Sequence, residues 1–324
     1  MSQWTFHGGR VAEARAFYGG EAWLDLSTGI NPDPWPGVAS LDIDWQRLPD
    51  QTALDELEEA AAAYLSVDPA FVCAVPGTEI GLRLLSDIGV AITAYIAPTY
   101  RTHAELVTSR VAIEARALPW PSESLILANP NNPDGRTFGR DLLCGQLAQA
   151  ARSEHWLVID EAFADVAPAT SLTDQIGDDR RLIIFRSFGK FFGLAGVRLG
   201  FVLGPREIIS RFRRKLGSWP VTAAALAIGT PAYRDQLWIE ATRQRLRQQA
   251  KALDAVLHRH GFVPIGDCPL FRLIETPDAA ALFDGLARQS ILTRPFDDQP
   301  HWLRIGLPGS DEALARLDRA LAHG

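Results

Sequence analysis

The sequence has few cysteines, and their spacing fits neither a disulfide framework nor a zinc site. Three cysteines, Cys73, Cys144 and Cys268, are spread over 324 residues. Their odd number and wide spacing exclude a disulfide framework and a zinc site of closely spaced ligands, so we expect no metal. Scarce and scattered thiols are typical of a reducing compartment, and a cytoplasmic location is predicted.

The chain also lacks a leader pattern, an apolar span and a basic surface. Its first residues show no basic start followed by an apolar run, and no apolar stretch is long enough to cross a bilayer. The formal net charge is -7, and the densest basic stretch, residues 211–215, has the pattern of a solvated helix face. We therefore expect neither a membrane nor a nucleic acid as a partner.

What the sequence does contain is the composition of a globular protein and enough length for two domains. The first forty or so residues are rich in Gly, Pro and Trp, and the prolines of 32–36 predict an extended arm. A helix is predicted to start near Thr52, which pairs with Asp55 as in a capping box. We predict an N-terminal arm over 1–44 that joins the small domain, a large domain over 45–218 and a small domain over 219–324.

Short apolar runs separated by helical patterns occupy the predicted large domain. The runs that indicate buried strands are Phe71–Val75, Ala91–Ile96, Leu125–Ala128, Trp156–Ile159, Leu182–Phe185 and Leu199–Leu203. Helical segments between several of them, such as Leu142–Arg152, indicate βαβ units and a mostly parallel sheet. Such sheets bind ligands at the carboxyl ends of their strands.

The pattern changes after Pro220. A long helical stretch from Tyr233 to His260 comes first. It is followed by two predicted strands, Arg272–Glu275 and Trp302–Leu307, and by a closing helix, Asp311–Ala322. This order predicts a smaller α+β domain.

A lysine stands directly after a buried strand, in the segment 187–200, which is rich in glycine. Lysine is rarely buried without a partner, and the glycines let the backbone approach a ligand closely. Ser187 and Arg198 flank Lys190, and both could hold an anion. A lysine that forms an imine with an aldehyde, beside a phosphate cup, meets these requirements. The alternative is a surface turn with a solvated lysine.

Asp160 ends a strongly apolar run, so its partly desolvated carboxylate needs a cation. A protonated pyridine nitrogen is such a cation, and an ionised aspartate would keep the ring protonated as an electron sink. The alternative is a helix N-cap or a structural salt bridge.

Three turns after strands add further polar groups. The turn at 129–136 carries Asn132, whose amide could point at a ligand. The segment 76–79 opens a helix, so Gly77 and Thr78 could bind phosphate through backbone N–H groups. Tyr100 follows another strand and could stack on a flat cofactor. Each feature alone has an ordinary structural explanation, but all five occur together in one order along the chain.

In this order of motifs the chain resembles fold-type I pyridoxal-phosphate enzymes, the class I/II aminotransferase family, in the branch of histidinol-phosphate aminotransferases. Within that branch it looks most like the threonine-phosphate decarboxylases of cobalamin biosynthesis. The segments that point to this subgroup are His7-Gly8-Gly9, residues 26–32 and residues 302–308. The resemblance implies an α/β, aspartate-aminotransferase-like fold, with a mostly parallel seven-stranded sheet and a small α+β domain. It also implies a homodimer with active sites near the interface.

The resemblance implies a role for each matching residue. Lys190 matches the lysine that holds pyridoxal 5'-phosphate as a Schiff base. Ser187 and Arg198, with Gly77 and Thr78, match the ligands of the cofactor phosphate. Asp160 matches the partner of the pyridine nitrogen, Asn132 the asparagine beside the ring's phenolic oxygen, and Tyr100 the stacking aromatic. The residues implied to bind substrate are His7, Gly29, Asn132, Arg294 and Arg304.

Two departures from the family pattern bear on the reaction. Many aminotransferases carry a tyrosine three residues after the strand-end aspartate, bonded to the phenolic oxygen, but here it is Phe163. A tyrosine that reaches the neighbouring subunit's cofactor phosphate in related enzymes is replaced by Leu48. The first change disfavours transamination, and the second removes a bond between subunits.

The implied reaction is loss of CO2 from L-threonine O-3-phosphate, which gives (R)-1-aminopropan-2-yl phosphate. The bond that breaks must stand perpendicular to the cofactor ring. Our hypothesis is that Arg304, with Arg294 and His7, clamps the substrate phosphate and leaves the carboxylate free to turn out of the ring plane. The alternatives are a histidinol-phosphate-type aminotransferase and a non-catalytic protein that retains the fold.

Overall fold

The structure is a computed structural model that describes residues 2–107, 111–115, 120 and 122–322. It divides into two compact units, which we describe separately. The larger unit consists of Pro34–Asn132 and Thr137–Glu240. The smaller unit consists of Met1–Asp33, Pro133–Arg136 and Ala241–Gly324. No helix in the described residues has the length and apolar content needed to cross a membrane.

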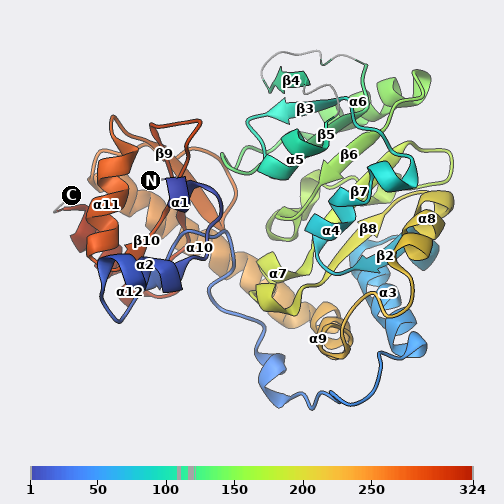
Figure 1. The fold of residues 1–324 in the computed structure, drawn as a ribbon, viewed down its shortest axis with the longest axis horizontal. Helices are drawn as coiled ribbons and strands as arrows, with labels where there is room; N and C mark the ends of the chain where they lie inside the picture. The colour runs from blue at the N-terminus through green and yellow to red at the C-terminus, as the bar shows by residue number, and fades with distance from the viewer. Residues whose placement is uncertain (1, 108–110, 116–119, 121, 323–324) are drawn as a thin grey trace. The chain divides into compact units, whose positions relative to one another are not determined.

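A seven-stranded sheet forms the centre of the larger unit (Figure 1). In spatial order its strands are β2 (Val72–Val75), β8 (Gly200–Leu203), β7 (Leu182–Ser187), β6 (Leu157–Asp160), β5 (Leu125–Ala128), β3 (Ala94–Ala97) and β4 (Val111–Glu114). The pairs from β7 to β4 are parallel, and β8 is antiparallel to both of its neighbours. The predicted mostly parallel sheet is confirmed, and β4 is a strand that the sequence patterns missed.

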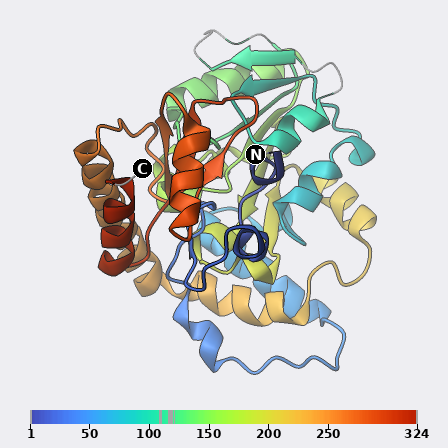
Figure 2. The ribbon, with the colours of Figure 1, turned by 60° about the vertical axis from the view of Figure 1, so that its left-hand side comes forward.

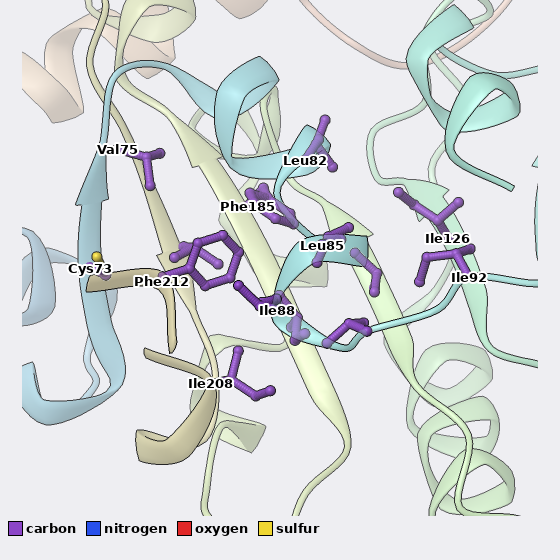
Figure 3. Packing of buried hydrophobic residues seen from close by; sticks show 14 of the residues in the cluster. Cys73, Val75, Leu82, Leu85, Ile88, Ile92, Ile126, Phe185, Ile208 and Phe212 are labelled. Atoms are coloured by element: carbon purple, nitrogen blue, oxygen red, sulfur yellow. The ribbon is translucent and has the colours of Figure 1, made fainter. Parts of the chain in front are cut away.

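Helices cover the sheet. Those of the larger unit are α3 (Gln51–Leu65), α4 (Thr78–Arg83), α5 (Arg101–Leu106), α6 (Arg140–Arg152), α7 (Phe188–Phe191), α8 (Arg206–Leu216) and α9 (Ala223–Arg234). Along each strand alternate side chains face opposite sides, so Ile183 and Phe185 of β7 share one face. Figure 3 shows this face, where Phe185 lies among Leu82 of α4 and Ile208 and Phe212 of α8. A large apolar core therefore fixes the strands whose ends carry the predicted site.

Over its described residues, the smaller unit combines a three-stranded sheet, a two-stranded pair and five helices. The strands are β1 (Leu24–Asp25), β9 (Phe271–Glu275), β10 (Ile291–Leu292), β11 (Arg294–Pro295) and β12 (Trp302–Gly306). The helices are α1 (Ser2–Thr5), α2 (Val11–Tyr18), α10 (Gln236–Arg259, which begins in the larger unit), α11 (Ala279–Arg288) and α12 (Asp311–Leu321). Figure 2 shows the dark blue N-terminal helices beside the orange and red C-terminal segments, and α2 contacts α11.

The units differ from the predicted domains at both boundaries. Residues 219–240 lie in the larger unit because α9 packs against α3, and residues 34–44 lie there because the 3-10 turn Pro36–Ser40 contacts α9. A Cβ on Gly229 of α9 would come within 2.6 Å of Leu57 of α3. The short stretch 133–136 belongs to the smaller unit, where the carbonyl oxygen of Gly135 accepts hydrogen bonds from the backbone of Asp267 and Cys268.

Two local predictions were wrong. Residues 2–5 and 11–18 are helical and not extended, and Val11–Tyr18 contains no proline or glycine that would interrupt a helix. The helix near residue 52 is capped by Asp50, whose Oδ1 accepts from the backbone N–H of Thr52, and not by a capping box at Thr52. The long helix predicted over Tyr233–His260 is confirmed as α10, which begins three residues later, at Gln236, and ends at Arg259.

Candidate active site

The residues predicted to bind the cofactor lie at one edge of the large sheet. Strands β3, β5, β6 and β7 are mutually parallel, and β2 runs in the same direction, because β8 is antiparallel to both β2 and β7. These strands therefore end at the same edge, and β8 begins there. The eight predicted cofactor residues all stand at or shortly after these strand ends, or just before β8: Gly77, Thr78, Tyr100, Asn132, Asp160, Ser187, Lys190 and Arg198.

Four of these residues form a cradle that suits an anion. Ser187, the last residue of β7, is paired with Gly200, the first residue of β8. Arg198 stands only two residues before Gly200, so Ser187 and Arg198 lie at the same end of the strand pair. A Cβ on Gly77 would lie 2.5 Å from Nη2 of Arg198, so a side chain at this position would displace the guanidinium. Gly77 also has φ +83°, a conformation that favours glycine. Hydroxyls from Ser187 and Thr78, a guanidinium and a helix start fit a phosphate group.

Asp160 is held by two neighbours. It is 5% exposed, and its Oδ1 accepts from the backbone N–H of Ala162 at 3.1 Å. Its Oδ2 lies 3.3 Å from Nε2 of the fully buried His103, whose Nδ1 is 2.7 Å from Oγ1 of Thr99. This arrangement orients the carboxylate and fits a cationic ring nitrogen. Sequence reasoning missed His103, although it stands only three residues after Tyr100. In the structure both lie at the start of α5, and the side chain of His103 reaches Asp160.

Tyr100 is fixed by a hydrogen bond to the start of α4. Its hydroxyl donates to Oε2 of Glu79 at 3.1 Å, and Thr102 donates to the same carboxylate. Burial, and then the charge of Glu79, raise the pKa of Tyr100 to about 12. The ring meets that of His103 edge-on at 5.8 Å. A neutral ring held in this way suits stacking on a flat ligand.

Lys190 lies in α7, directly beyond the end of β7. Its Nζ is 5.9 Å from the ring centroid of Phe163, which is 5% exposed. The lysine therefore meets an aromatic face where many relatives in the implied family carry a phenol. Lys190 and the phosphate cradle stand at the same strand end, as an imine-forming lysine beside a phosphate cup requires.

A buried ion network joins the two strands that carry the site. Arg186 precedes Ser187 on β7, and its guanidinium bonds Glu161, which follows Asp160, and Asp165. Tyr64 of α3 donates to Asp165 at 2.9 Å. Burial acts to lower the pKa of Arg186, but the charges of Asp165 and Glu161 outweigh it and raise the pKa. The network therefore fixes the relative positions of the strand ends of β6 and β7.

Replacing Arg186 with methionine should destabilise the protein by about 3–5 kcal/mol, because two buried carboxylates would lose their cation. Urea unfolding of the purified protein measures this loss. Arg181→Met is a matched control at the start of the same strand, since the Arg181–Glu154 pair is exposed. Its free energy of unfolding should change by no more than about 0.5 kcal/mol. Equal effects of the two substitutions would contradict a role for the buried network.

The residues predicted to bind substrate, apart from Asn132, lie in the smaller unit. Arg294 of β11 stands directly opposite Arg304 of β12 in the antiparallel register. Nη2 of Arg304 donates to the carbonyl oxygen of Ser27 at 2.9 Å, and Nη2 of Arg294 donates to that of Phe6 at 3.1 Å. These bonds bring the segments around His7 and Gly29 to the pair of arginines.

The arginine pair carries two neighbouring positive charges. Arg304 is only 6% exposed, and burial, followed by the charge of Arg294, lowers its pKa to about 9. A lowered pKa means that the surroundings disfavour the cation, so an anion bound there would gain from the interaction. Gly9 donates its backbone N–H to Oγ of Ser27 at 2.7 Å, which fixes the N-terminal segment beside the pair. This arrangement would suit a second anion.

Comparisons with known proteins define first the class and then the family. A solved histidinol-phosphate aminotransferase from Sinorhizobium meliloti in complex with pyridoxal-5'-phosphate aligns with a TM-score of 0.80 at 20% identity, covering 96% of this chain and 93% of that chain. The fold is thus of the aspartate-aminotransferase type, the fold type I of pyridoxal-phosphate enzymes. The family described as aminotransferase class I and II matches residues 110–321. The chain belongs to this family.

Two curated relatives are similar over their full length. A threonine-phosphate decarboxylase from Sinorhizobium sp is 40% identical, and the alignment covers 100% of this chain and 99% of the relative. A threonine-phosphate decarboxylase from Pseudomonas aeruginosa is also 40% identical, with 97% of this chain and 96% of the relative covered. The resemblance deduced from the sequence motifs is therefore confirmed.

Proposed function

We propose that the chain binds pyridoxal 5'-phosphate through Lys190 and decarboxylates L-threonine O-3-phosphate to (R)-1-aminopropan-2-yl phosphate and CO2. The observation that carries the choice of substrate is the pair Arg294–Arg304, whose two adjacent charges suit a dianionic phosphate ester. The 40% identity to two threonine-phosphate decarboxylases supports the same choice. A role of this product in cobalamin biosynthesis is a further proposal, which rests on the sequence resemblance alone.

The residues at the sheet edge would hold the cofactor. Gly77, Thr78, Ser187 and Arg198 would bind its phosphate, Asp160 its pyridine nitrogen and Asn132 its phenolic oxygen, with Tyr100 stacked on the ring. When bound, pyridoxal phosphate supplies an electron sink for the electron pair released at the substrate's α-carbon. Lys190 holds the cofactor in the resting enzyme and returns a proton to that α-carbon after CO2 has left.

The arginine pair would select which bond breaks. Guanidinium groups bind phosphate through two parallel hydrogen bonds, so Arg304 and Arg294 can fix the substrate by its phosphate. His7 would add a donor from the N-terminal segment, and Gly29 would leave room for the substrate. With the arginines bound to phosphate, the carboxylate is left to stand perpendicular to the ring, which is the orientation that decarboxylation requires.

We also propose that the protein acts as a homodimer. Three exposed apolar side chains of the larger unit, Trp45, Leu48 and Trp219, support this proposal. Leu48 stands at the position that carries the cross-subunit tyrosine in related enzymes, so a different contact would join the subunits there.

Transamination of a phosphorylated amine is the second candidate function. The likeness to a solved histidinol-phosphate aminotransferase favours it, since the cofactor residues would be the same. Phe163 argues against it, because the ring beside Lys190 offers no hydroxyl to the phenolic oxygen. Loss of that donor would change the electronics of the bound cofactor and so disfavour transamination relative to decarboxylation.

Changing Phe163 to tyrosine should therefore increase transamination relative to decarboxylation by about tenfold, the effect of one hydrogen bond. The ratio of pyridoxamine cofactor formed to CO2 released measures the change. Phe71→Tyr adds the same hydroxyl near the opposite edge of the sheet, where β2 begins, and should leave the ratio unaltered. An unaltered ratio in Phe163→Tyr would show that this position does not influence the choice of reaction.

The proposed function is tested by reconstitution with pyridoxal phosphate and assay with two substrates. The account predicts a visible absorbance band and decarboxylation of L-threonine O-3-phosphate, with kcat/KM at least about a hundredfold above that for L-threonine. A band without preference for the phosphorylated substrate would contradict the role of the arginine pair. A protein without any band would be a non-catalytic member of the fold.

A further inference from the structure

The turn that carries Asn132 is closed at its base by a buried amide. Asn129 follows β5 and is fully buried. Its Oδ1 accepts from the backbone N–H of Phe138 at 2.8 Å, and its Nδ2 donates to the carbonyl oxygen of Phe138 at 3.3 Å. One side chain thus satisfies both hydrogen-bonding groups of one residue's backbone, as a paired strand residue would.

Asn129 is also tied to the strand that carries Asp160. Its backbone N–H donates to the carbonyl oxygen of Asp160 at 2.9 Å, next to the paired residues Ala128 and Asp160. Phe138 is itself fixed, since its ring meets that of the buried Trp120 edge-on at 5.0 Å. The base of the turn therefore rests on both the large sheet and its apolar surroundings.

The segment between these two anchors leaves the larger unit and returns to it. The chain passes into the smaller unit after Asn132 and re-enters the larger unit at Thr137. Asn131 adds a second tie, because its Nδ2 donates to the carbonyl oxygen of Pro98, two residues before Tyr100. Asn132 is thus the last residue of a short stretch, 129–132, that is bonded to the turns or strands carrying Asp160 and Tyr100.

We infer that Asn129 is a positioning residue for the cofactor site and acts through Asn132. This inference rests on the proposed function, in which the Asn132 amide lies beside the phenolic oxygen of pyridoxal phosphate. Without the Asn129 amide, the two hydrogen bonds to the backbone of Phe138 are lost, and the base of the turn is free to open. The two residues between Asn129 and Asn132 would then no longer fix where the Asn132 amide points.

A double-mutant cycle with Asn129→Ala and Asn132→Ala tests this inference. Two properties of the loaded protein are measured besides activity: the dissociation constant of pyridoxal phosphate, and the pH at which its visible band changes. Each single change should weaken cofactor binding by about tenfold and raise that pH, because a donor to an anionic oxygen is lost or misplaced. The double variant should show no more than the effect of Asn132→Ala alone, since the two residues act as a unit.

A control separates positioning from simple loss of stability. Ser124 lies at the opposite end of β5, is also buried, and accepts the backbone N–H of Trp156 at 3.2 Å. Ser124→Ala should lower the urea midpoint but leave the dissociation constant and the pH of the spectral change as in the wild type. A spectral shift of the same size in Ser124→Ala would contradict the inference.

A conservative variant keeps the test decisive where Asn129→Ala does not fold. In Asn129→Asp a protonated carboxyl can still donate to Phe138 and accept from it, whereas an ionised carboxylate cannot donate. Cofactor affinity of Asn129→Asp should therefore approach the wild-type value at low pH and fall further below it as pH rises. Parallel pH profiles of this variant and the wild type would contradict the inference.

The outcomes also distinguish this inference from the proposed function. A wild-type protein without a visible band would contradict both. A wild type with a band, together with strictly additive effects of the two asparagine changes, would contradict the positioning role of Asn129 alone and leave the cofactor site standing.

Discussion

Changing Lys190 to alanine is expected to abolish decarboxylation, with a loss in kcat of more than about a thousandfold. Lys190 is proposed both to hold the cofactor covalently and to return a proton to the substrate, so no other group replaces it. Borohydride reduction followed by mass analysis measures the covalent part directly. The wild type should gain the mass of one cofactor on the peptide that contains Lys190, and the variant should not.

Lys251 provides the matched control for this experiment. It is an exposed lysine on α10, so Lys251→Ala should retain both activity and the cofactor-labelled peptide. Labelling that persisted at another lysine in Lys190→Ala, with activity intact, would show that the strand-end lysine has been assigned the wrong role.

Changing Arg304 to alanine should lower kcat/KM for L-threonine O-3-phosphate by about 100-fold to 10,000-fold. A bidentate, charge-assisted contact to phosphate contributes about two hydrogen bonds of 1.5–3 kcal/mol each, which corresponds to this range. Arg304→Lys keeps the charge but loses the planar pair of donors, so it should recover only part of the loss. The dissociation constant of pyridoxal phosphate should change little, since the residues proposed to hold the cofactor belong to the larger unit.

The unphosphorylated substrate is the control that gives this prediction its specificity. The rate with L-threonine should be almost the same in the wild type and in Arg304→Ala, because no phosphate is present to be bound. If both substrates lost activity in proportion, Arg304 would act through the stability of β12, where it also bonds the Ser27 carbonyl, and the phosphate clamp would be wrong.

The sheet and its functional edge could be predicted because they depend on patterns local in sequence. Apolar runs such as Leu125–Ala128 matched the strand, and polar residues at their ends, such as Asp160, fell at the edge where parallel strands bind ligands. The strand Val111–Glu114 was missed, because its apolar run is only three residues long and ends at a charged residue. The predicted starts of α3 and α10 were displaced by one and three residues from the observed starts. In both cases an aspartate side chain, Asp50 or Asp235, accepts a hydrogen bond from the first turn and sets where the helix begins.

The contacts that position the site could not be predicted in this way. His103 meets Asp160 across 57 positions of sequence, and Tyr64 meets Asp165 across 101. Such pairs depend on how strands and helices are placed in space, which no single stretch of sequence encodes. The Asn129 amide is an intermediate case, since its partner is only nine residues away, yet the turn motif alone indicates a turn former and not an anchor.

The most direct test of the proposed reaction is to follow the carboxyl group of the substrate. L-Threonine O-3-phosphate labelled with carbon-13 in that group is mixed with protein loaded with pyridoxal phosphate, and labelled CO2 and the cofactor spectrum are measured together. The account predicts one labelled CO2 for each substrate consumed, with the cofactor returning to its initial spectrum. Absence of labelled CO2, with conversion of the cofactor to its pyridoxamine form by histidinol phosphate, would contradict decarboxylation and identify an aminotransferase.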